Sequence, residues 1–156
     1  MGAPGTYVLV VNLHDDTTLS IGRLGAFVFA AGHYCYVGSA LGPGGLTARL
    51  ARHLSRAKRP HWHIDYLLQR AVVVEIWSRC LTERLECSWT GSLLRLRGAR
   101  PAVTGFGSSD CRCLTHLVYL HETSALTSLR RHLRHLGAAP WRSIQPPCPP
   151  KTGESQ

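Results

Sequence analysis

The segment GHYCYVGSALGPGGLTARLARHLSRAKRPHWHIDYLL, residues 32–68, joins a tyrosine-rich stretch to a glycine-rich turn and then to a basic helix. The tyrosine-rich stretch has the composition of a β-strand, and the turn SALGPGG ends it. A helix is predicted over residues 46–57, because apolar side chains recur there at helical spacing. Its buried stripe is Leu46, Leu50 and Leu54. Basic side chains flank the stripe at helical steps, namely Arg49, Arg52, His53 and Arg56.

The segments on either side of this unit predict more strands and a second helix. GTYVLVVNL, residues 5–13, is rich in β-branched residues and is predicted to be a strand. Residues 19–38 are broken by glycines into two or three further short strands, so an antiparallel meander is expected. HWHIDYLLQR, residues 61–70, predicts a short helix, and AVVVEIW, residues 71–77, a buried strand.

The second half of the chain predicts two more helices. One begins near Thr82, and Glu86 falls at the edge of its apolar face. That face comprises Leu81, Leu85, Trp89, Leu93 and Leu96. A loop, residues 97–113, and an apolar run, residues 114–120, precede the last helix. That helix is expected to bury Leu126, Leu129, Leu133 and Leu136 and to expose Arg130, Arg131, Arg134 and His135. We expect one α+β domain over residues 5–137, in which helices flank a small central antiparallel sheet of about three or four strands. Residues 138–156 are proline-rich and are expected to be disordered.

The charge of the chain indicates a polyanionic partner. Eighteen Lys and Arg stand against nine Asp and Glu, which gives a net charge of +9. Such a surface favours nucleic acid first and an anionic membrane second, and a merely basic protein is the alternative. Lysine occurs only at positions 58 and 151, so arginine supplies nearly all of the charge. The forked guanidinium suits phosphate, which favours nucleic acid.

The six cysteines are expected to be free thiols or metal ligands, because the chain has no apolar stretch of spanning length and no signal segment. An intracellular protein, in the cytoplasm, nucleoid or nucleus, is therefore expected. In CRCLTH, the residues Cys111, Cys113 and His116 can form a structural zinc site with Cys80 or Cys87 as the fourth ligand. Buried thiols are the alternative. Cys148 is expected to be a free thiol.

Two short motifs carry a resemblance to a known family. GTY, residues 5–7, and YVG, residues 36–38, are similar to the paired strand motifs of the GIY-YIG nucleases. The helix after the second motif then supplies Arg49 and His53 at i, i+4, and RLECSW supplies Glu86. The whole pattern resembles a small stand-alone branch of that family, which in some proteins is fused to a DNA glycosylase of the endonuclease III type. Each tripeptide alone is weak, and the ordered set is what carries the resemblance.

The resemblance implies a metal-dependent phosphodiester hydrolase. Glu86 would be the protein ligand of Mg²⁺ or Mn²⁺, Arg49 would hold the scissile phosphate, and Tyr7 would deprotonate or position the attacking water. Tyr36 and His53 would complete the pocket. Nucleic-acid contacts are expected from Ser39, which stands where the family often has a lysine, and from Arg52, Arg56, Lys58 and Arg59. Taken singly, each of these residues has an ordinary structural role as its alternative.

A second group, HWHID, brings His61, His63 and Asp65 together in sequence. The two histidines fall on different faces of the predicted helix, so capping or phosphate contact is expected rather than metal binding. Asp65 can orient His53 through a hydrogen bond.

We therefore expect an endonuclease acting on DNA rather than RNA, in repair or in the processing of DNA structures. Two alternatives stay open: a nucleic-acid-binding module that kept the fold without the activity, and a zinc-stabilised interaction domain.

Overall fold

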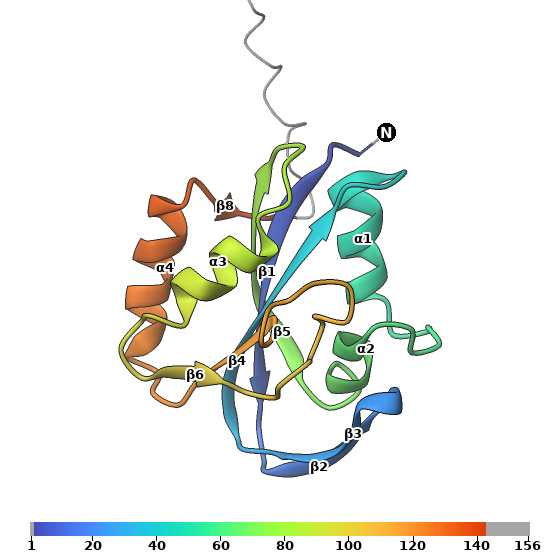
Figure 1. The fold of residues 1–156 in the computed structure, drawn as a ribbon, viewed down its shortest axis with the longest axis vertical. Coiled ribbons are helices and arrows are strands. Elements are labelled where there is room, and N and C mark those ends of the chain that lie inside the picture. Colours follow the sequence, from blue (N-terminus) through green and yellow to red (C-terminus); the bar gives the residue numbers. More distant parts are fainter. Residues whose placement is uncertain (1, 143–156) are drawn as a thin grey trace, which may run out of the picture.

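The chain folds around a six-stranded antiparallel sheet, and the structure, a computed structural model, describes residues 2–142 (Figure 1). The strand order is β6-β7-β4-β1-β5-β8. The strands are β1 Gly5–Leu13, β4 Gly32–Ala40, β5 Val72–Cys80, β6 Ala99–Pro101, β7 Leu117–Leu120 and β8 Ala139–Pro140. The predicted α+β class with a central antiparallel sheet is confirmed. The expected three or four strands were too few, because the edge strands β6 and β8 are only three and two residues long and have loop-like sequences.

Strand β1 is one of the two central strands of the sheet, and its two faces are both buried. Tyr7, Leu9 and Val11 face one apolar cluster, whereas Val8 and Val10 face another. All five side chains are fully buried. A strand covered on both sides needs an apolar residue at every position, which explains the nearly continuous apolar run of residues 7–11. The two predicted motif strands are neighbours, since β1 pairs with β4 and places Tyr7 opposite Gly38.

Four helices cover the two faces of the sheet in pairs (Figure 1). They are α1 Gly45–Leu54, α2 His63–Leu67, α3 Glu86–Leu93 and α4 Ala125–His135. Leu50 of α1 and Ile64 of α2 pack in the cluster that contains Tyr7. Leu93 of α3 and Leu129 of α4 pack in the cluster that contains Val8. The molecule therefore has three layers, with helices α1 and α2 on one face and α3 and α4 on the other.

A β-hairpin occupies the interval between the two motif strands. Strands β2, Thr17–Ile21, and β3, Gly25–Phe29, pair with each other in a separate two-stranded sheet, joined by the short helix η1, Gly22–Leu24. The expected meander is therefore only partly formed, because these strands do not join the main sheet. Ile21 and Phe29 pack into the cluster beside α2, so the hairpin closes one end of that core.

Helix α1 is shorter than predicted at its carboxyl end. It ends at Leu54, and Ser55 already has extended backbone. Leu50 is buried as expected, but Leu54 is half exposed, so the predicted stripe loses its last member. At the other end, Gly45 has φ +57° and a Cβ there would lie 2.4 Å from the carbonyl oxygens of residues 2 and 3. Only glycine lets the start of α1 pack this closely under the amino-terminal segment.

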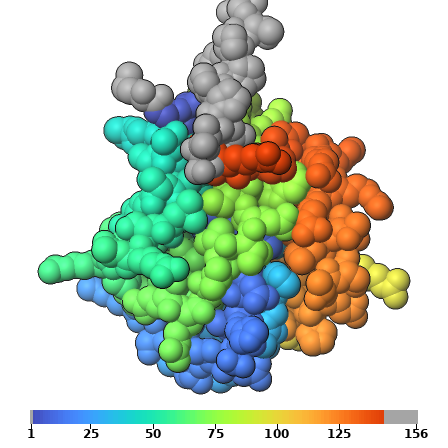
Figure 2. All heavy atoms as spheres, turned by 180° about the vertical axis from the view of Figure 1, so that it is seen from behind, coloured from blue at the N-terminus to red at the C-terminus, as the bar shows by residue number. Residues whose placement is uncertain are grey.

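The remaining elements agree with the sequence in kind and differ in their details. Strand β5 was predicted to be buried, but it is buried only in part. Val72 and Val74 are exposed, because alternate side chains in the first half of the strand face away from the core. In Figure 2, residues of β5 form the middle of the reverse face, between the regions of α1 and α4. Helix α3 begins at Glu86 rather than near Thr82. In α4, the leucines 126, 129 and 133 are buried as predicted, and Leu136 is half-buried. Arg130, predicted to be exposed, forms an ion pair with Glu75 at 2.9 Å.

The first residues of the segment predicted to be disordered, 138–142, are part of the fold. Ala138 is buried, and β8 pairs with β5 so that Pro140 lies opposite Trp77. Residues 143–156, with Cys148, lie outside the described residues. Among residues 2–142, no helix has the length and apolarity needed to cross a bilayer.

Candidate functional site

A polar pocket of about 340 Å³ lies where the carboxyl end of β4 meets α1, the start of α3 and the loop before β7. Three of the five predicted catalytic residues line it: Tyr36, Arg49 and Glu86. Of the other predicted residues, Ser39, His61, His63 and His116 lie at its wall, and so do Ser109 and Asp110 of the loop before β7, for which no role was predicted. Residues separated by up to 80 positions in sequence thus converge on one concave surface.

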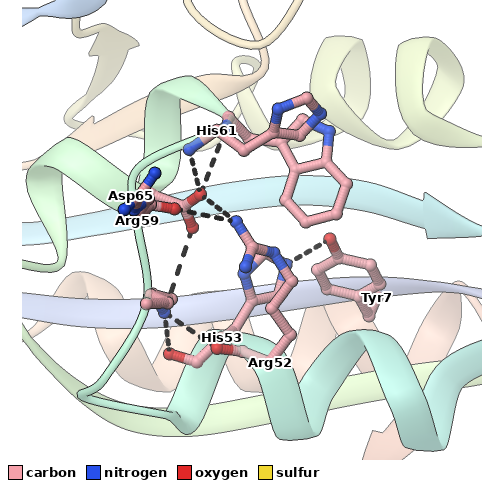
Figure 3. Close-up of polar contacts among 8 residues, drawn as sticks. Tyr7, Arg52, His53, Arg59, His61 and Asp65 are labelled. Carbon is pink, nitrogen blue, oxygen red and sulfur yellow. Dashed lines mark hydrogen bonds and ion pairs between the residues drawn. The ribbon is translucent and has the colours of Figure 1, made fainter.

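The other two predicted catalytic residues, Tyr7 and His53, lie directly behind this pocket. The Tyr7 hydroxyl and Nε2 of His53 are 2.6 Å apart, and both side chains are buried (Figure 3). The Tyr36 ring is 6.4 Å from the Tyr7 ring and 6.2 Å from that of His53, centroid to centroid. Tyr7 lies opposite Gly38, a pocket residue where a Cβ would come within 2.5 Å of the Tyr7 hydroxyl oxygen. The Tyr7 hydroxyl therefore lies just beneath the pocket wall.

Burial sets the protonation of this pair. It raises the pKa of Tyr7 to about 12, although the Arg49 guanidinium opposes the change. It lowers the pKa of His53 to about 3, against the attraction of Asp65. Tyr7 is therefore a neutral phenol at neutral pH, and His53 a neutral imidazole. Two neutral rings can share this hydrogen bond in either direction, with the phenol O–H donating to Nε2 or the Nε2–H donating to the phenol oxygen, according to the tautomer of His53. The pKa of Tyr36 is also raised by burial.

Arg49 is held in the pocket wall by two contacts. Its guanidinium donates to the carbonyl oxygen of Ser39 at 2.9 Å and lies over the Trp62 ring at 4.3 Å from the centroid. Arg52, one turn further along α1, also lies over Trp62, at 4.7 Å. A guanidinium fixed by one carbonyl and one aromatic face keeps its other donors for an anion in the pocket.

Glu86 is the first residue of α3 and is half-buried. A carboxylate is favoured at the amino end of a helix by the unpaired backbone N–H groups there. Two exposed residues beside it in the pocket wall, Arg84 and Asp110, form an ion pair at 3.7 Å. The sequence pattern found Glu86, but Arg84 carried no signal of its own.

Asp65 does not orient His53 as predicted. Its Oδ2 accepts the backbone N–H groups of His61 and Trp62 and the guanidinium of Arg52, at 2.8–3.0 Å (Figure 3). The other oxygen, Oδ1, and Nδ1 of His53 are both buried and make no hydrogen bond within residues 2–142. Asp65 therefore caps α2 and ties it to α1. The capping role predicted for HWHID therefore belongs to the Asp65 carboxylate. Nδ1 of His63 accepts a hydrogen bond from the backbone N–H of Gly107 and so holds the loop that contains Gly107.

The predicted nucleic-acid contacts divide into two groups. Arg56 and Arg59 are exposed in the segment that follows α1, and Ser39 lines the pocket. Lys58, by contrast, donates to the carbonyl oxygens of Arg52 and His53 and so caps the end of α1. Arg52 is engaged by Asp65. Phosphate contact by these residues stays a prediction. Lys58 and Arg52 also have an internal role in the structure.

A cluster of possible metal ligands adjoins the pocket. One ligand atom each of Cys87, Cys111, Cys113 and His116 lies within 4.8 Å of all the others, so the cluster can hold a metal ion. Cys80, the alternative to Cys87 as the fourth ligand, does not belong to this cluster. Cys87 and Cys113 are joined by a disulfide, whereas free thiols or metal ligands were expected; Cys35 and Cys111 are free. Burial lowers the pKa of His116, which favours the neutral imidazole that a metal requires.

Fold and pocket together define a small α+β domain with a polar pocket lined by arginine, carboxylate and phenol groups. The chain belongs to the family described as "Domain of unknown function DUF123", whose model matches residues 6–138. No curated protein and no solved structure matches the chain.

Proposed function

We propose that this chain is a divalent-metal-dependent endonuclease of the GIY-YIG kind that hydrolyses phosphodiester bonds in DNA. One observation carries the proposal: Tyr36, Arg49 and Glu86, from three different elements, line the same pocket, and the Tyr7–His53 pair lies directly behind it. The five residues were predicted from the resemblance of the sequence to the GIY-YIG nucleases. A structural role for each would not require them to meet at one pocket.

The donor set of the pocket suits Mg²⁺ or Mn²⁺. Its carboxylates are Glu86 and Asp110, and Ser109 adds a hydroxyl. These are hard oxygen donors, which bind such cations with several water molecules retained. Glu86 would be the principal ligand, because it is half-buried, whereas Asp110 is exposed and already paired with Arg84. When bound, the cation supplies positive charge for activating water and for stabilising the developing phosphate charge.

The side chains around Glu86 supply the other groups that phosphodiester hydrolysis needs. Arg49 contacts the non-bridging oxygens of the scissile phosphate with the donors that Ser39 leaves free. The Tyr7 hydroxyl is fully buried behind the pocket wall, so taking the proton of the attacking water would require the hydroxyl to reach the pocket and first to pass its own proton to Nε2 of His53. Burial opposes this transfer, since it raises the pKa of Tyr7 and lowers that of His53. Positive charge at Arg49 and at the metal would lower the pKa of Tyr7 in the loaded site.

The charge of the surface supports nucleic acid as the substrate. The chain has a net charge of +9, and the exposed arginines 56 and 59 lie in the segment that follows α1, the helix that carries Arg49. Binding through such contacts is independent of sequence and falls steeply with salt.

Two further parts of the proposal concern the Cys/His cluster and the rival functions. The cluster supports a structural zinc ion, because three sulfurs and one imidazole are the ligand set typical of such sites. A non-catalytic DNA-binding module would bind without cutting. A zinc-stabilised interaction domain would need zinc and neither bind nor cut DNA.

The test is a cleavage assay of the purified wild type, Glu86→Gln and the control Glu83→Gln. Glu83 is an exposed carboxylate near Glu86 in sequence that does not line the pocket. The substrates are supercoiled plasmid, single strands, flaps, junctions, abasic duplex and structured RNA, each with Mg²⁺, with Mn²⁺ and with chelator. We expect metal-dependent cutting by the wild type and Glu83→Gln, and none by Glu86→Gln, whose DNA binding is unchanged or tighter. Salt-sensitive binding without cutting by the wild type would instead support the binding module.

A further inference from the structure

Two of the distances between donor atoms of the Cys/His cluster match the spacing of ligands around a zinc ion. Nε2 of His116 lies 3.4 Å from Sγ of Cys111 and 3.7 Å from Sγ of Cys87. With Zn–S of about 2.3 Å and Zn–N of about 2.0 Å, ligand atoms around one zinc ion are about 3.5–3.8 Å apart. One pair departs from this spacing: Cys87 and Cys113 are bonded directly to each other. The same four residues therefore fit two states, a zinc site and a disulfide.

The cluster also connects the parts that form one side of the candidate active site. Cys87 follows Glu86 directly in the first turn of α3, and Cys111 and Cys113 belong to the loop that carries Ser109 and Asp110. His116 directly precedes β7 and itself lines the pocket. A ligand bound by all four residues holds the start of α3, the loop and β7 together. The position of Glu86 then depends on the state of the cluster.

We propose that the cluster is a redox-controlled zinc site that governs the wall of the pocket carrying Glu86. In the reduced protein, zinc is bound by Cys87, Cys111, Cys113 and His116. Oxidation joins Cys87 to Cys113, removes two of the four ligands and releases the metal. The exchange of zinc for a disulfide stands on the cluster alone, whereas its effect on cleavage rests on the proposed nuclease function.

The oxidation can be written with hydrogen peroxide as the oxidant. The exposed Cys87 thiolate attacks one peroxide oxygen, the O–O bond breaks, and a sulfenic acid and hydroxide form. The Cys113 thiolate then attacks the Cys87 sulfur, the S–O bond breaks, and a second hydroxide leaves. Two electrons pass from the sulfurs to peroxide, and two protons from solvent convert the hydroxides to water. Zn²⁺ leaves, and Cys111 takes a proton to become a thiol.

The first experiment measures zinc and thiols in the full chain, without any nuclease assay. The protein is purified with reductant and zinc, and bound metal is measured by mass spectrometry of the elements. We expect about one zinc per chain, and its loss after peroxide treatment. Peptide mapping should then find the Cys87–Cys113 disulfide, and reductant with added zinc should restore the metal. Absence of zinc from the reduced protein, or its retention after peroxide, would overturn the proposal.

Three variants separate the zinc site from the disulfide. Cys113→Ser removes a partner common to both states, so zinc is lost and Cys87 forms no bond to position 113. Cys111→Ser removes only a zinc ligand, so zinc is lost or weakened while Cys87 and Cys113 still oxidise. Cys35→Ala removes a buried free cysteine of β4, outside the cluster, and should leave both zinc and the disulfide unchanged. Equal zinc content in Cys111→Ser and the wild type would overturn the assignment of the ligands.

The coupling to Glu86 is tested by amide hydrogen exchange followed by mass spectrometry. Removing zinc from the reduced protein should increase exchange in peptides covering residues 86–90 and 105–116, and leave those of β1 unchanged. If zinc binds but exchange at residues 86–90 does not respond to its removal, the coupling is wrong and the zinc site stands. If exchange responds and no substrate is cut, the nuclease proposal fails and the switch stands.

Discussion

The Tyr7 hydroxyl lies 2.6 Å from Nε2 of His53, and the exposed fractions of these side chains are 0% and 3%. Strand β1 and helix α1 are thus joined by a hydrogen bond that solvent does not reach. A buried hydrogen bond of this kind is costly to break from one side only, because the remaining partner stays desolvated. The pair that the resemblance assigns to chemistry is therefore also part of the core.

Replacing Tyr7 by phenylalanine separates these two roles. Tyr7→Phe leaves Nε2 of His53 buried without a partner, so the free energy of unfolding should fall by about 1–3 kcal/mol. If the proposed function is right, cleavage should also be lost. The matched control is Tyr34→Phe, since Tyr34 is equally buried in β4 and its hydroxyl donates to Ala30 outside the pocket. Denaturant titration and the cleavage assay are run on both, and equal activity of the two variants would remove Tyr7 from the mechanism.

The depressed pKa of His53 predicts lower stability in mild acid. The folded state holds this imidazole neutral down to a pH of about 3, whereas the unfolded chain takes up the proton near its ordinary pKa of 6.5. Unfolding therefore binds a proton between these values, and stability is lost as the pH falls below about 6.5. The loss approaches about 1.4 kcal/mol per pH unit for one such group.

The measurement is the free energy of unfolding at pH 7.5, 6.0 and 5.0 in the wild type and in His53→Gln. The pKa values of His63 and His116 are also lowered by burial, so both proteins should lose stability in acid. The variant should lose less, because its glutamine does not titrate. Parallel curves for the two proteins would show that His53 keeps an ordinary pKa.

The sequence contained enough to predict the class of fold, because that class depends on local patterns. The β-branched run of residues 5–13 and the leucines of α4 follow strand and helix periodicity, and both elements formed where expected. The five candidate residues were found through a resemblance to a family. In the structure, three of them line one pocket and the other two form a hydrogen-bonded pair behind it. The edge strands β6 and β8 were missed, because their pairing depends on tertiary contacts and not on their own composition.

The partners of the buried charges could not be predicted. Asp65 was expected to bond to His53, yet it caps α2 and pairs with Arg52. Lys58 caps α1 in addition to the phosphate contact that stays a prediction for it, and this internal role was not predicted. The contact of Asp65 with Arg52 depends on how α1 and α2 lie against each other, which helical spacing along a single segment does not specify. The disulfide between Cys87 and Cys113 likewise joins segments 26 positions apart, and no spacing rule pairs them.

Arg49 is expected to contribute to turnover more than to affinity. Arg49→Ala should lower the cleavage rate by about 10²–10³-fold, the effect typical of removing a donor that stabilises transition-state charge. Arg49→Lys should restore little of the lost cleavage rate. A lysine ammonium cannot stack on the Trp62 ring and at the same time donate hydrogen bonds to the Ser39 carbonyl and to phosphate. The control is Arg56→Ala, an exposed arginine after α1, which should weaken binding and reduce its salt dependence while the rate of the bound complex is unchanged. Single-turnover rates and binding isotherms distinguish these outcomes, and equal losses of rate and affinity in Arg49→Ala would make it an ordinary phosphate contact.

Gly38 is expected to be required for the position of the Tyr7 hydroxyl. A Cβ at this residue would lie 2.5 Å from the hydroxyl oxygen and 2.6 Å from Cζ of the same ring, so Gly38→Ala forces the buried phenol away from His53. Overpacking of this kind costs about 1–3 kcal/mol of stability. The control is Gly42→Ala, at an exposed glycine just after β4 where an added Cβ meets nothing within 4 Å. Thermal unfolding should separate the two variants, and a second substitution, Tyr7→Phe, should relieve part of the strain because it removes the hydroxyl that collides. A double variant that loses as much stability as the sum of the two single variants would show that the Gly38 backbone, and not its contact with Tyr7, is what the substitution disturbs.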